Sequence, residues 1–411
     1  MVNASGNCKE ANPQNPDPRA MRVTHVITRL IVGGAQENTV ASVLGLRQKP
    51  GLEVDLISGP TAGPEGTLEP AFAKDPGALR ILPELVRPVH PWKDCQAWRR
   101  LTVEFRLRRP DIVHTHSGKA GVLGRLAARR AGVPTIVHTI HGPSFGDFQG
   151  ALPNLIFRAA ERYAASATTH FVVVADRMTE QYLAAGIGRP DRYTKVLSGF
   201  DLAPFLSATM DLQLRTKLGL AADDFVVGKI ARLFKLKGHD DLFAVAPELV
   251  RQCPRIKFLL VGDGEWRRRF EERARTLNLG RHFVFTGLVP PAEVPRYVGI
   301  MNALVHLSRR EGLPRALPQA LAAARPVVAY DCDGASEVCR DGETGFLIAP
   351  GDHAAVARKL LQLAAEPALC SRLGSRGQAF VRERFSVERM VDDLHSLYQR
   401  LTSLPRTAGV T

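Results

Sequence analysis

Several residue types that mark particular protein classes are scarce in this sequence. The chain has 411 residues but only six cysteines, which form no CxxC pair and are too dispersed for a disulfide scaffold. This excludes a zinc ribbon, a dithiol redox motif and a small disulfide-rich secreted fold. No apolar run approaches the roughly 20 residues that cross a bilayer, and residues 1–20 lack the apolar stretch of a signal peptide. We therefore expect reduced thiols and a soluble, cytoplasmic protein.

The length and the apolar content indicate more than one hydrophobic core. A chain of 411 residues with 45% hydrophobic residues is longer than one core usually serves, so two domains are expected. Residues 1–20 are the exception, because they are rich in proline and asparagine and hold almost nothing large and apolar. Such a segment cannot offset the entropy of ordering, and the sequence predicts a disordered tail there.

Short runs rich in valine, isoleucine and threonine alternate with helical stretches, in two series. The first series covers 23–28, 53–58, 111–117, 135–140 and 170–175, and the second covers 225–232, 257–264, 283–287, 303–308, 326–331 and 345–350. Alternation of this kind is typical of parallel sheets with crossover helices. The predicted fold class is α/β, with two Rossmann-like, doubly wound parallel-sheet domains that face each other across a cleft.

The domain boundaries follow from the break between the two series. A linker is expected in the polar, proline-containing stretch 201–220, which gives a first domain over 21–205 and a second over 206–385. The last helical stretch, 386–403, has no strand after it, and we expect it to pack back on the first domain. Ligands of open α/β sheets bind outside the carboxyl ends of the strands, so the chemistry is expected in the cleft.

Positive charge is concentrated in one segment. The formal net charge is +14, and residues 87–130 carry eleven basic side chains against three acidic ones. Large apolar residues accompany the arginines there, namely Trp92, Trp98, Leu101, Phe105 and Leu107. Two interpretations stay open: a basic amphipathic helix on an anionic membrane surface, or a solvated helix whose apolar side faces the core. A nucleic-acid partner is not expected, because no recognition motif is present.

Two loops that follow predicted strands carry groups suited to an anionic ligand. Gly33 and Gly34 permit a tight turn in which backbone N–H groups approach a ligand at the start of a helix. Arg232 ends a strand, and Lys235 and Lys237 precede the next helix, a cluster that suits a diphosphate. Each signal is weak alone. A glycine pair without the GxGxxG spacing is most often a plain turn, and a charge run is most often a solvated surface.

The strongest motif is the strand–loop–helix–strand segment ALVHLSRREGLPRALPQALAAARPVVAYDCDG, residues 303–334. Glu311 and Gly312 lie in its loop, and the free backbone amides of Gly312 and Leu313 suit an anionic ligand. Gln319 follows about one turn inside the helix and is expected to border the same pocket. A carboxylate beside a phosphate site is unusual unless it accepts hydrogen bonds from sugar hydroxyls.

A set of short motifs occurs in a fixed order along residues 21–400: VGGAQ, PDIVHTHSGKAGVLGRLAARRAGVP, VHTIHG, VLSGFD, ARLFKLKGH, LVGDGE, FTGLV and EGLPRALPQALAAARPVVAYDCDGASEV. With these motifs the chain resembles glycosyltransferase family 4, the retaining enzymes of the two-Rossmann GT-B architecture. The resemblance implies a nucleotide-sugar donor as co-substrate, no metal and no other cofactor.

The resemblance also implies roles for individual residues. Catalytic roles fall to Arg232 and Lys237 at the departing diphosphate, to Glu311 at the transferred sugar, and to His141 lying over that sugar. Binding roles fall to a larger set made mostly of loop backbone: Gly33, Gly34, Gly287, Val289, Gly312, Leu313 and Gln319. In that set the glycine pair faces the diphosphate, and the backbone around Gly287 and Val289 meets the nucleotide base.

Two positions depart from the family pattern. The second acid of the family's acidic pair is replaced by Gln319, and the common Asn-Gly before Asp201 reads Ser198-Gly199. Glutamine keeps a carbonyl acceptor but loses the negative charge. If this position binds ribose hydroxyls, we expect the change to affect the preference for the sugar donor more than its binding.

No metal site is expected. The Asp331-Cys332-Asp333 sequence resembles a cation-binding DxD, but it is interpreted as the end of a strand followed by the turn that any βα loop requires. His114 and His116 alternate on one strand and point to one face, without a carboxylate or a third ligand nearby in sequence. They are interpreted as core or site-lining histidines.

The function expected from these features is a retaining, metal-independent transfer of a hexose. The donor is a nucleotide diphosphate sugar, with UDP as the expected nucleotide, and the acceptor is a saccharide or a lipid-linked saccharide of cell-surface polysaccharide or glycoconjugate synthesis. The alternatives are a sugar-nucleotide epimerase or phosphorylase of the same architecture, or a non-catalytic subunit that binds a nucleotide sugar. A peripheral position on the cytoplasmic membrane face accompanies the lipid-linked acceptor.

Overall fold

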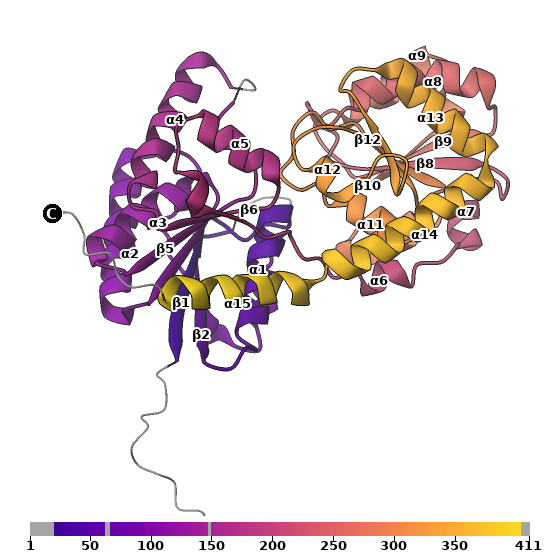
Figure 1. The fold of residues 1–411 in the computed structure, drawn as a ribbon. Helices are drawn as coiled ribbons and strands as arrows, with labels where there is room; N and C mark the ends of the chain where they lie inside the picture. Colours follow the sequence, from indigo (N-terminus) through magenta and orange to yellow (C-terminus); the bar gives the residue numbers. More distant parts are fainter. Residues whose placement is uncertain (1–19, 62–65, 147–148, 404–411) are drawn as a thin grey trace, which may run out of the picture.

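The computed structural model describes residues 20–61, 66–146 and 149–403, so the predicted tail lies almost wholly outside the described residues. Two α/β domains stand side by side, the first indigo to magenta and the second pink to orange in Figure 1. Each has one parallel sheet with helices on both faces. The expected fold class is confirmed.

The first domain is built on a seven-stranded sheet with the order β3-β2-β1-β4-β5-β6-β7. Its strands are β1 (Met21–Ile27), β2 (Leu52–Ser58), β3 (Leu79–Ile81), β4 (Ile112–His116), β5 (Thr135–Ile140), β6 (His170–Val173) and β7 (Tyr193–Lys195). Its helices are α1 (Gly34–Leu46), α2 (Pro91–Arg108), α3 (Gly118–Ala131), α4 (Ala151–Ala165) and α5 (Asp176–Ala184). The sequence did not predict β3 and β7, which are three-residue strands at the two edges.

The second domain repeats the pattern on a six-stranded sheet with the order β10-β9-β8-β11-β12-β13. Its strands are β8 (Phe225–Ile230), β9 (Ile256–Val261), β10 (Phe283–Gly287), β11 (Ala303–His306), β12 (Val327–Tyr330) and β13 (Gly345–Ile348). Its helices are α6 (Ala203–Leu206), α7 (Leu212–Lys217), α8 (His239–Gln252), α9 (Arg267–Thr276), α10 (Val294–Gly299), α11 (Ala316–Ala322), α12 (Ala335–Val338), α13 (His353–Ala365) and α14 (Pro367–Arg384).

The strand order reverses once in each sheet, and this places the site. In the first domain β1 pairs with both β2 and β4, and in the second β8 pairs with both β9 and β11. The loops that leave two such strands diverge to opposite faces and open a crevice at their carboxyl ends. The loops after β1, β8 and β11 contain most of the predicted site residues.

The chain crosses between the domains twice, and the two crossings touch. The backbone N–H of Phe200 donates to the carbonyl of Phe385 at 2.8 Å, and a Cβ built on Gly199 would lie 2.5 Å from the carbonyl oxygen of Ser386. Inside the stretch 201–220 two short helices, α6 and α7, bury Phe205 and Leu214 in the core of the second domain. The crossing itself therefore lies at residues 199–200, a few residues before the expected boundary.

Helix α15 (Val387–Ser403) follows the second crossing and lies along the first domain next to α1, whereas α14 lies under the second domain (Figure 1). Its buried side chains are Met390, Val391, Leu394, Leu397 and Tyr398. They join the core that α1 forms with one face of the first sheet. A helix of the last segment thus completes the first domain.

The basic segment 87–130 forms α2, β4 and α3. Leu101 and Phe105 of α2 face the core, while Trp92 and Leu107 are 68% and 75% exposed. Among the described helices, none has the length and apolar character needed to cross a membrane.

Candidate active site

A cavity of about 990 Å³ lies between the two domains, at the carboxyl ends of their central strands. Its lining contains most of the residues singled out from the sequence: Gly33, Gly34, Arg232, Lys237, Val289, Glu311, Leu313 and Gln319. These residues come from four loops and two helices that are distant in the chain. Both domains therefore contribute to a single ligand-sized space.

Glu311 and Lys237 form an ion pair at the floor of this cavity. The Nζ of Lys237 lies 2.5 Å from Oε1 of Glu311, and both side chains are about four-fifths buried. Burial alone would raise the pKa of the Glu311 carboxyl, but the ammonium of Lys237 and then His306 lower it below its ordinary value. Glu311 is thus an ionised carboxylate that can accept hydrogen bonds from hydroxyl groups.

A second lysine, Lys229 on β8, lies beneath this pair. Its side chain is 1% exposed, and its Nζ makes no hydrogen bond within the described part of the chain. Burial, and then the charge of Lys237, lower its pKa to about 7. The sequence does not single out Lys229, because a lysine inside a strand has no motif of its own.

Asp333 shapes the loop that carries Glu311. Its Oδ2 accepts the backbone N–H of Glu311 at 2.8 Å, and its Oδ1 accepts the side-chain amide of Gln181, from the first domain, at 3.1 Å. Asp333 has a φ of 49°, a left-handed conformation that aspartate tolerates in turns. Its carboxylate oxygens are therefore engaged in holding the loop and the neighbouring domain.

Three predicted residues lie outside the larger cavity. His141 lines a second cavity of about 310 Å³ that also borders α4, α5 and Arg310. Gly312 touches His141 across the cleft, because a Cβ on Gly312 would lie only 1.6 Å from the carbonyl oxygen of His141. Gly287 ends β10 with a φ of 74° beside Arg267. The structure thus brings His141 and Gly312 together, whereas Gly287 lines neither of the two cavities.

Polar contacts join the two domains beside the two cavities. Arg315, at the start of α11, forms an ion pair with Glu37 of α1, and both side chains line the larger cavity. Arg310 donates from Nη2 to the carbonyl of Pro143 at 2.6 Å. Sequence reasoning missed Glu37 and Arg315, since the members of this pair are 278 positions apart and come together only through the domain arrangement.

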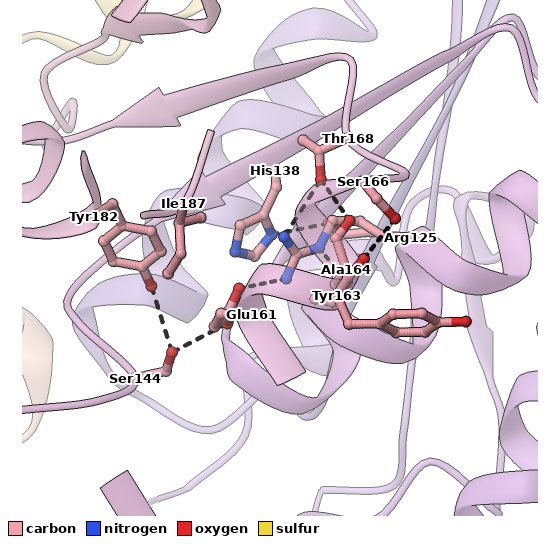
Figure 2. A network of polar contacts seen from close by, with 12 residues as sticks. Arg125, His138, Ser144, Glu161, Tyr163, Ala164, Ser166, Thr168, Tyr182 and Ile187 are labelled. Atoms are coloured by element: carbon pink, nitrogen blue, oxygen red, sulfur yellow. Dashed lines mark hydrogen bonds and ion pairs between the residues drawn. The ribbon is translucent and has the colours of Figure 1, made fainter. Parts of the chain in front are cut away.

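A buried ion pair supports the loop after β5. Nη2 of Arg125 lies 2.6 Å from Oε2 of Glu161, with exposures of 0% and 2% (Figure 2). The other carboxylate oxygen of Glu161 accepts from the hydroxyl of Ser144 at 3.0 Å, and Arg125 also donates to the carbonyl of Gly121 at 2.7 Å. Ser144 is three residues after His141, so this network fixes the loop in which His141 sits.

The chain matches two family descriptions, one for each domain. Residues 33–198 match "Glycosyl transferase 4-like domain", and residues 211–380 match "Glycosyl transferases group 1". The glycosyltransferase-family protein EpsD of Bacillus subtilis (strain 168) is 31% identical over 295 residues, which are 70% of this chain and 76% of EpsD. The UDP-Gal:alpha-D-GlcNAc-diphosphoundecaprenol alpha-1,3-galactosyltransferase of Escherichia coli is 28% identical over 77% of this chain and 82% of that enzyme.

Solved structures share the architecture. Anabaena Alr3699/HepE in complex with UDP and glucose has a TM-score of 0.78 at 21% identity, over 92% of this chain and 100% of that one. The sucrose-phosphate synthase of Thermosynechococcus elongatus has a TM-score of 0.75 at 19% identity, over 93% and 99% of the two chains. At this level of identity the likeness establishes the fold. With a relative at 31% identity and a family match in each domain, the chain belongs to the family 4 glycosyltransferases of GT-B fold and is a glycosyltransferase.

Proposed function

We propose that this enzyme transfers a hexose, with retention of configuration, from UDP-sugar to a saccharide or lipid-linked saccharide acceptor of cell-surface polysaccharide or glycoconjugate synthesis. The observation that carries the proposal is the cavity between the domains, where Arg232, Lys237 and ionised Glu311 face the Gly33-Gly34 turn. The names of two similar proteins support it: the Escherichia coli relative uses UDP-Gal and a diphosphoundecaprenol acceptor, and the Anabaena structure contains UDP and glucose.

In the second domain, some residues contact the diphosphate of the sugar donor and others contact its sugars. Arg232 and Lys237 stabilise the charge that grows on the departing diphosphate, the largest catalytic term available to such a site. Backbone amides at Gly312 and Leu313 contact phosphate oxygens, and Gln319 accepts from ribose hydroxyls. Glu311 accepts hydrogen bonds from the hexose. Lys237 is held by Glu311 at 2.5 Å before the sugar donor arrives, so the ammonium is already positioned.

Retention without a covalent sugar–enzyme intermediate requires attack on the face from which the diphosphate departs. An oxygen of that diphosphate takes the proton of the attacking hydroxyl, so no protein group is assigned as general base. The first domain binds the sugar acceptor, with His141 beside the transferred sugar, and closure of the two domains excludes water. The reaction is proposed to need no metal, since Arg232, Lys237 and the loop amides supply positive charge where a cation would otherwise act.

Two experiments test the proposal. Thermal shift with a panel of nucleoside diphosphates and nucleotide sugars identifies the base and the sugar, because a ligand of the native state raises the apparent stability. With that sugar donor, Arg232→Ala and Lys237→Ala are expected to lower turnover by about 10² or more. Arg268→Ala is the matched control, since it removes a side chain that is 89% exposed on α9 of the same domain. Near-normal turnover in either site variant would refute the assigned roles.

Gln319 favours a second candidate, a non-catalytic subunit that binds a nucleotide sugar. Such a subunit would bind the nucleotide in the thermal-shift panel but would release no nucleoside diphosphate with any acceptor. An epimerase would convert the nucleotide sugar without a saccharide acceptor, and a phosphorylase would do so once inorganic phosphate is added to accept the sugar. Product analysis with and without acceptor, and with and without phosphate, therefore distinguishes the transferase from all three.

A membrane surface is the proposed location of a lipid-linked acceptor. On α2 the exposed Trp92 and Leu107 lie among basic side chains, and on α4 the side chains of Leu152, Leu155 and Ile156 are 55–67% exposed. Apolar and basic residues together suit the interface of an anionic bilayer. Sedimentation with anionic liposomes, weakened by added salt, is the expected result; equal binding to neutral liposomes would count against it.

A further inference from the structure

Buried histidines form a hydrogen-bonded chain that runs from His141 into the first domain. Nε2 of His141 lies 3.0 Å from Nδ1 of His116, and Nε2 of His116 lies 2.9 Å from Nδ1 of His25. Nε2 of His25 then lies 3.2 Å from the hydroxyl of Tyr398. His25, His116 and Tyr398 are at most 1% exposed. The chain thus connects the loop after β5, strands β4 and β1, and helix α15.

The chain continues on the far side of the tyrosine. The hydroxyl of Tyr398 also lies 2.5 Å from Nδ1 of His114, and Nε2 of His114 lies 2.6 Å from Oγ1 of Thr139. Tyr398 therefore stands between two histidines with a single proton to donate. Which of the two histidines accepts that proton determines which atom donates and which accepts in every hydrogen bond between Tyr398 and His141.

The four histidines of this hydrogen-bonded chain, His25, His114, His116 and His141, are neutral. Burial lowers the pKa of His25 to about 3 and that of His141 to about 4. Burial, and then the neighbouring histidines, lower the pKa of His114 and of His116 well below the ordinary value. A neutral imidazole has one N–H and one lone pair, so each ring donates on one side and accepts on the other. The chain can therefore have only one direction at a time.

The contacts of Tyr398 favour one direction. An O–H donor typically lies 2.5–3.0 Å from its acceptor, and an N–H donor about 2.7–3.2 Å. The 2.5 Å contact therefore fits a hydroxyl that donates to His114, and the 3.2 Å contact fits an N–H of His25 that donates to the tyrosine oxygen. With His25 protonated at Nε2, its Nδ1 accepts from His116. Nδ1 of His116 then accepts from His141.

The direction of the chain leaves Nδ1 of His141 with a lone pair. That atom makes no hydrogen bond to the residues that the structure describes, and His141 lines the cavity of about 310 Å³ next to Gly312. We propose that Tyr398, His25 and His116 are positioning residues that hold His141 in the tautomer whose Nδ1 accepts a hydrogen bond from a hydroxyl group in the cleft. That this hydroxyl belongs to a sugar rests on the proposed function.

Helix α15 gives this arrangement a second consequence. Tyr398 lies on α15, which begins at the crossing between the domains, where Phe200 and Phe385 are hydrogen-bonded. The hydroxyl that sets the direction of the chain is therefore supplied by the segment that joins the domains. A shift of α15 against the first domain changes the distance from the Tyr398 hydroxyl to His25. Through the hydrogen bonds of His25 and His116, it also changes the tautomer and orientation of His141.

A bound metal ion is the competing interpretation of this cluster. One ligand atom from each of His25, His114 and His116 lies within 4.8 Å of the others, a grouping that a metal ion can use. However, the rings of His25 and His116 are stacked at 12°, and those of His114 and His116 at 27°. Lone pairs in nearly parallel planes do not converge on a tetrahedral centre. These nitrogens are also engaged in the hydrogen bonds described above.

The tautomer of His141 is measured directly by long-range ¹H–¹⁵N NMR of the full chain labelled with [¹⁵N]histidine, without any ligand. His141→Gln assigns the signals. In the wild type we expect Nδ1 of His141 to be unprotonated, and in Tyr398→Phe we expect a mixture of both tautomers. Tyr193→Phe is the control, because it removes a tyrosine hydroxyl that donates to the carbonyl of Ile187 at 2.8 Å, away from the chain.

Kinetics give an independent readout. Tyr398→Phe and His116→Phe are expected to lower kcat/KM about tenfold while Tyr193→Phe leaves it unchanged, by analogy with the hydrogen bonds that orient metal-bound histidines, whose loss costs about tenfold or more. A protonated Nδ1 on wild-type His141, or a tautomer that Tyr398→Phe leaves unchanged, would overturn the proposal. Stoichiometric zinc that is lost in His25→Phe would overturn it as well. The NMR result needs no substrate, so a wild-type chain without transfer activity would refute the proposed function alone.

Discussion

Gly312→Ala tests whether the two domains must approach as closely as the structure shows. A Cβ at this position would lie 1.6 Å from the carbonyl oxygen of His141, and real Cβ atoms essentially never come within 3.0 Å of such an atom. The loop and His141 would therefore have to separate by about 1.4 Å. A misplacement of about 1 Å in an active site can cost about 10²-fold. We expect kcat/KM to fall by about 10², roughly 2.7 kcal/mol of transition-state stabilisation.

The assay is the initial rate of nucleoside diphosphate release with a sugar donor and acceptor, together with the dissociation constant of the nucleoside diphosphate. The dissociation constant is expected to change less than the rate, because Arg232 and Lys237 remain in place within the second domain. Gly280→Ala is the matched control: a Cβ on this exposed glycine of the same domain would meet nothing within 4 Å.

The melting temperature of Gly312→Ala should stay near that of the wild type, because the clash lies between two domains that can move apart as units. A rate within about threefold of the wild type, in a protein that melts normally, would show that the contact between Gly312 and His141 is absent in the reacting enzyme. His141 would then not lie over the transferred sugar.

Two further predictions concern buried charges. Lys229→Met is expected to raise the free energy of unfolding by several kcal/mol at pH 6 and by less at pH 9.5, measured from urea midpoints. The pKa of Lys229 is lowered from 10.5 to about 7 in the folded protein, so between these values the unfolded chain binds more protons than the folded one. The wild type therefore gains stability as pH rises through that window, and the advantage of the variant shrinks. An equal gain at both pH values would contradict a charged, unpaired lysine. Glu161→Gln is expected to cost about 3 kcal/mol, because it leaves Arg125 buried without its carboxylate, and the pair Arg125→Met/Glu161→Leu should recover part of this loss. A loss below about 1 kcal/mol in Glu161→Gln would show that water reaches the pair.

The sheet architecture was predictable because its signal is local. Runs such as 23–28 and 225–232 are apolar enough to be buried on both faces of a parallel strand, and each was found as a strand. The edge strands β3 and β7 were missed because Leu79–Ile81 and Tyr193–Lys195 are three residues long and only partly buried, so they carry no apolar run. Short edge strands take their conformation from the neighbour they pair with.

The candidate site was partly predictable for the same reason. Arg232, Lys237 and Glu311 stand in loops directly after strands, and Gln319 lies in the helix that follows the loop of Glu311. The rule that ligands bind at the carboxyl ends of strands predicts that all four border one cavity, as they do. The sequence also shows that a neutral Gln319 stands at the second position of the acidic pair, so that Glu311 is the single acid of this motif.

Only the tertiary structure decided which of these groups touch and which others join them. The pairs Lys237 with Glu311, Glu37 with Arg315, and His25 with Tyr398 are formed by residues far apart in the chain. His114 and His116 were visible as a pair on one strand, but their partners come from β1 and from a helix of the last segment. The apolar pattern of a few neighbouring residues is enough to specify a strand. A hydrogen bond or an ion pair between distant residues forms only within a few ångströms, so it depends on the relative positions of two whole domains and of the helix that crosses between them.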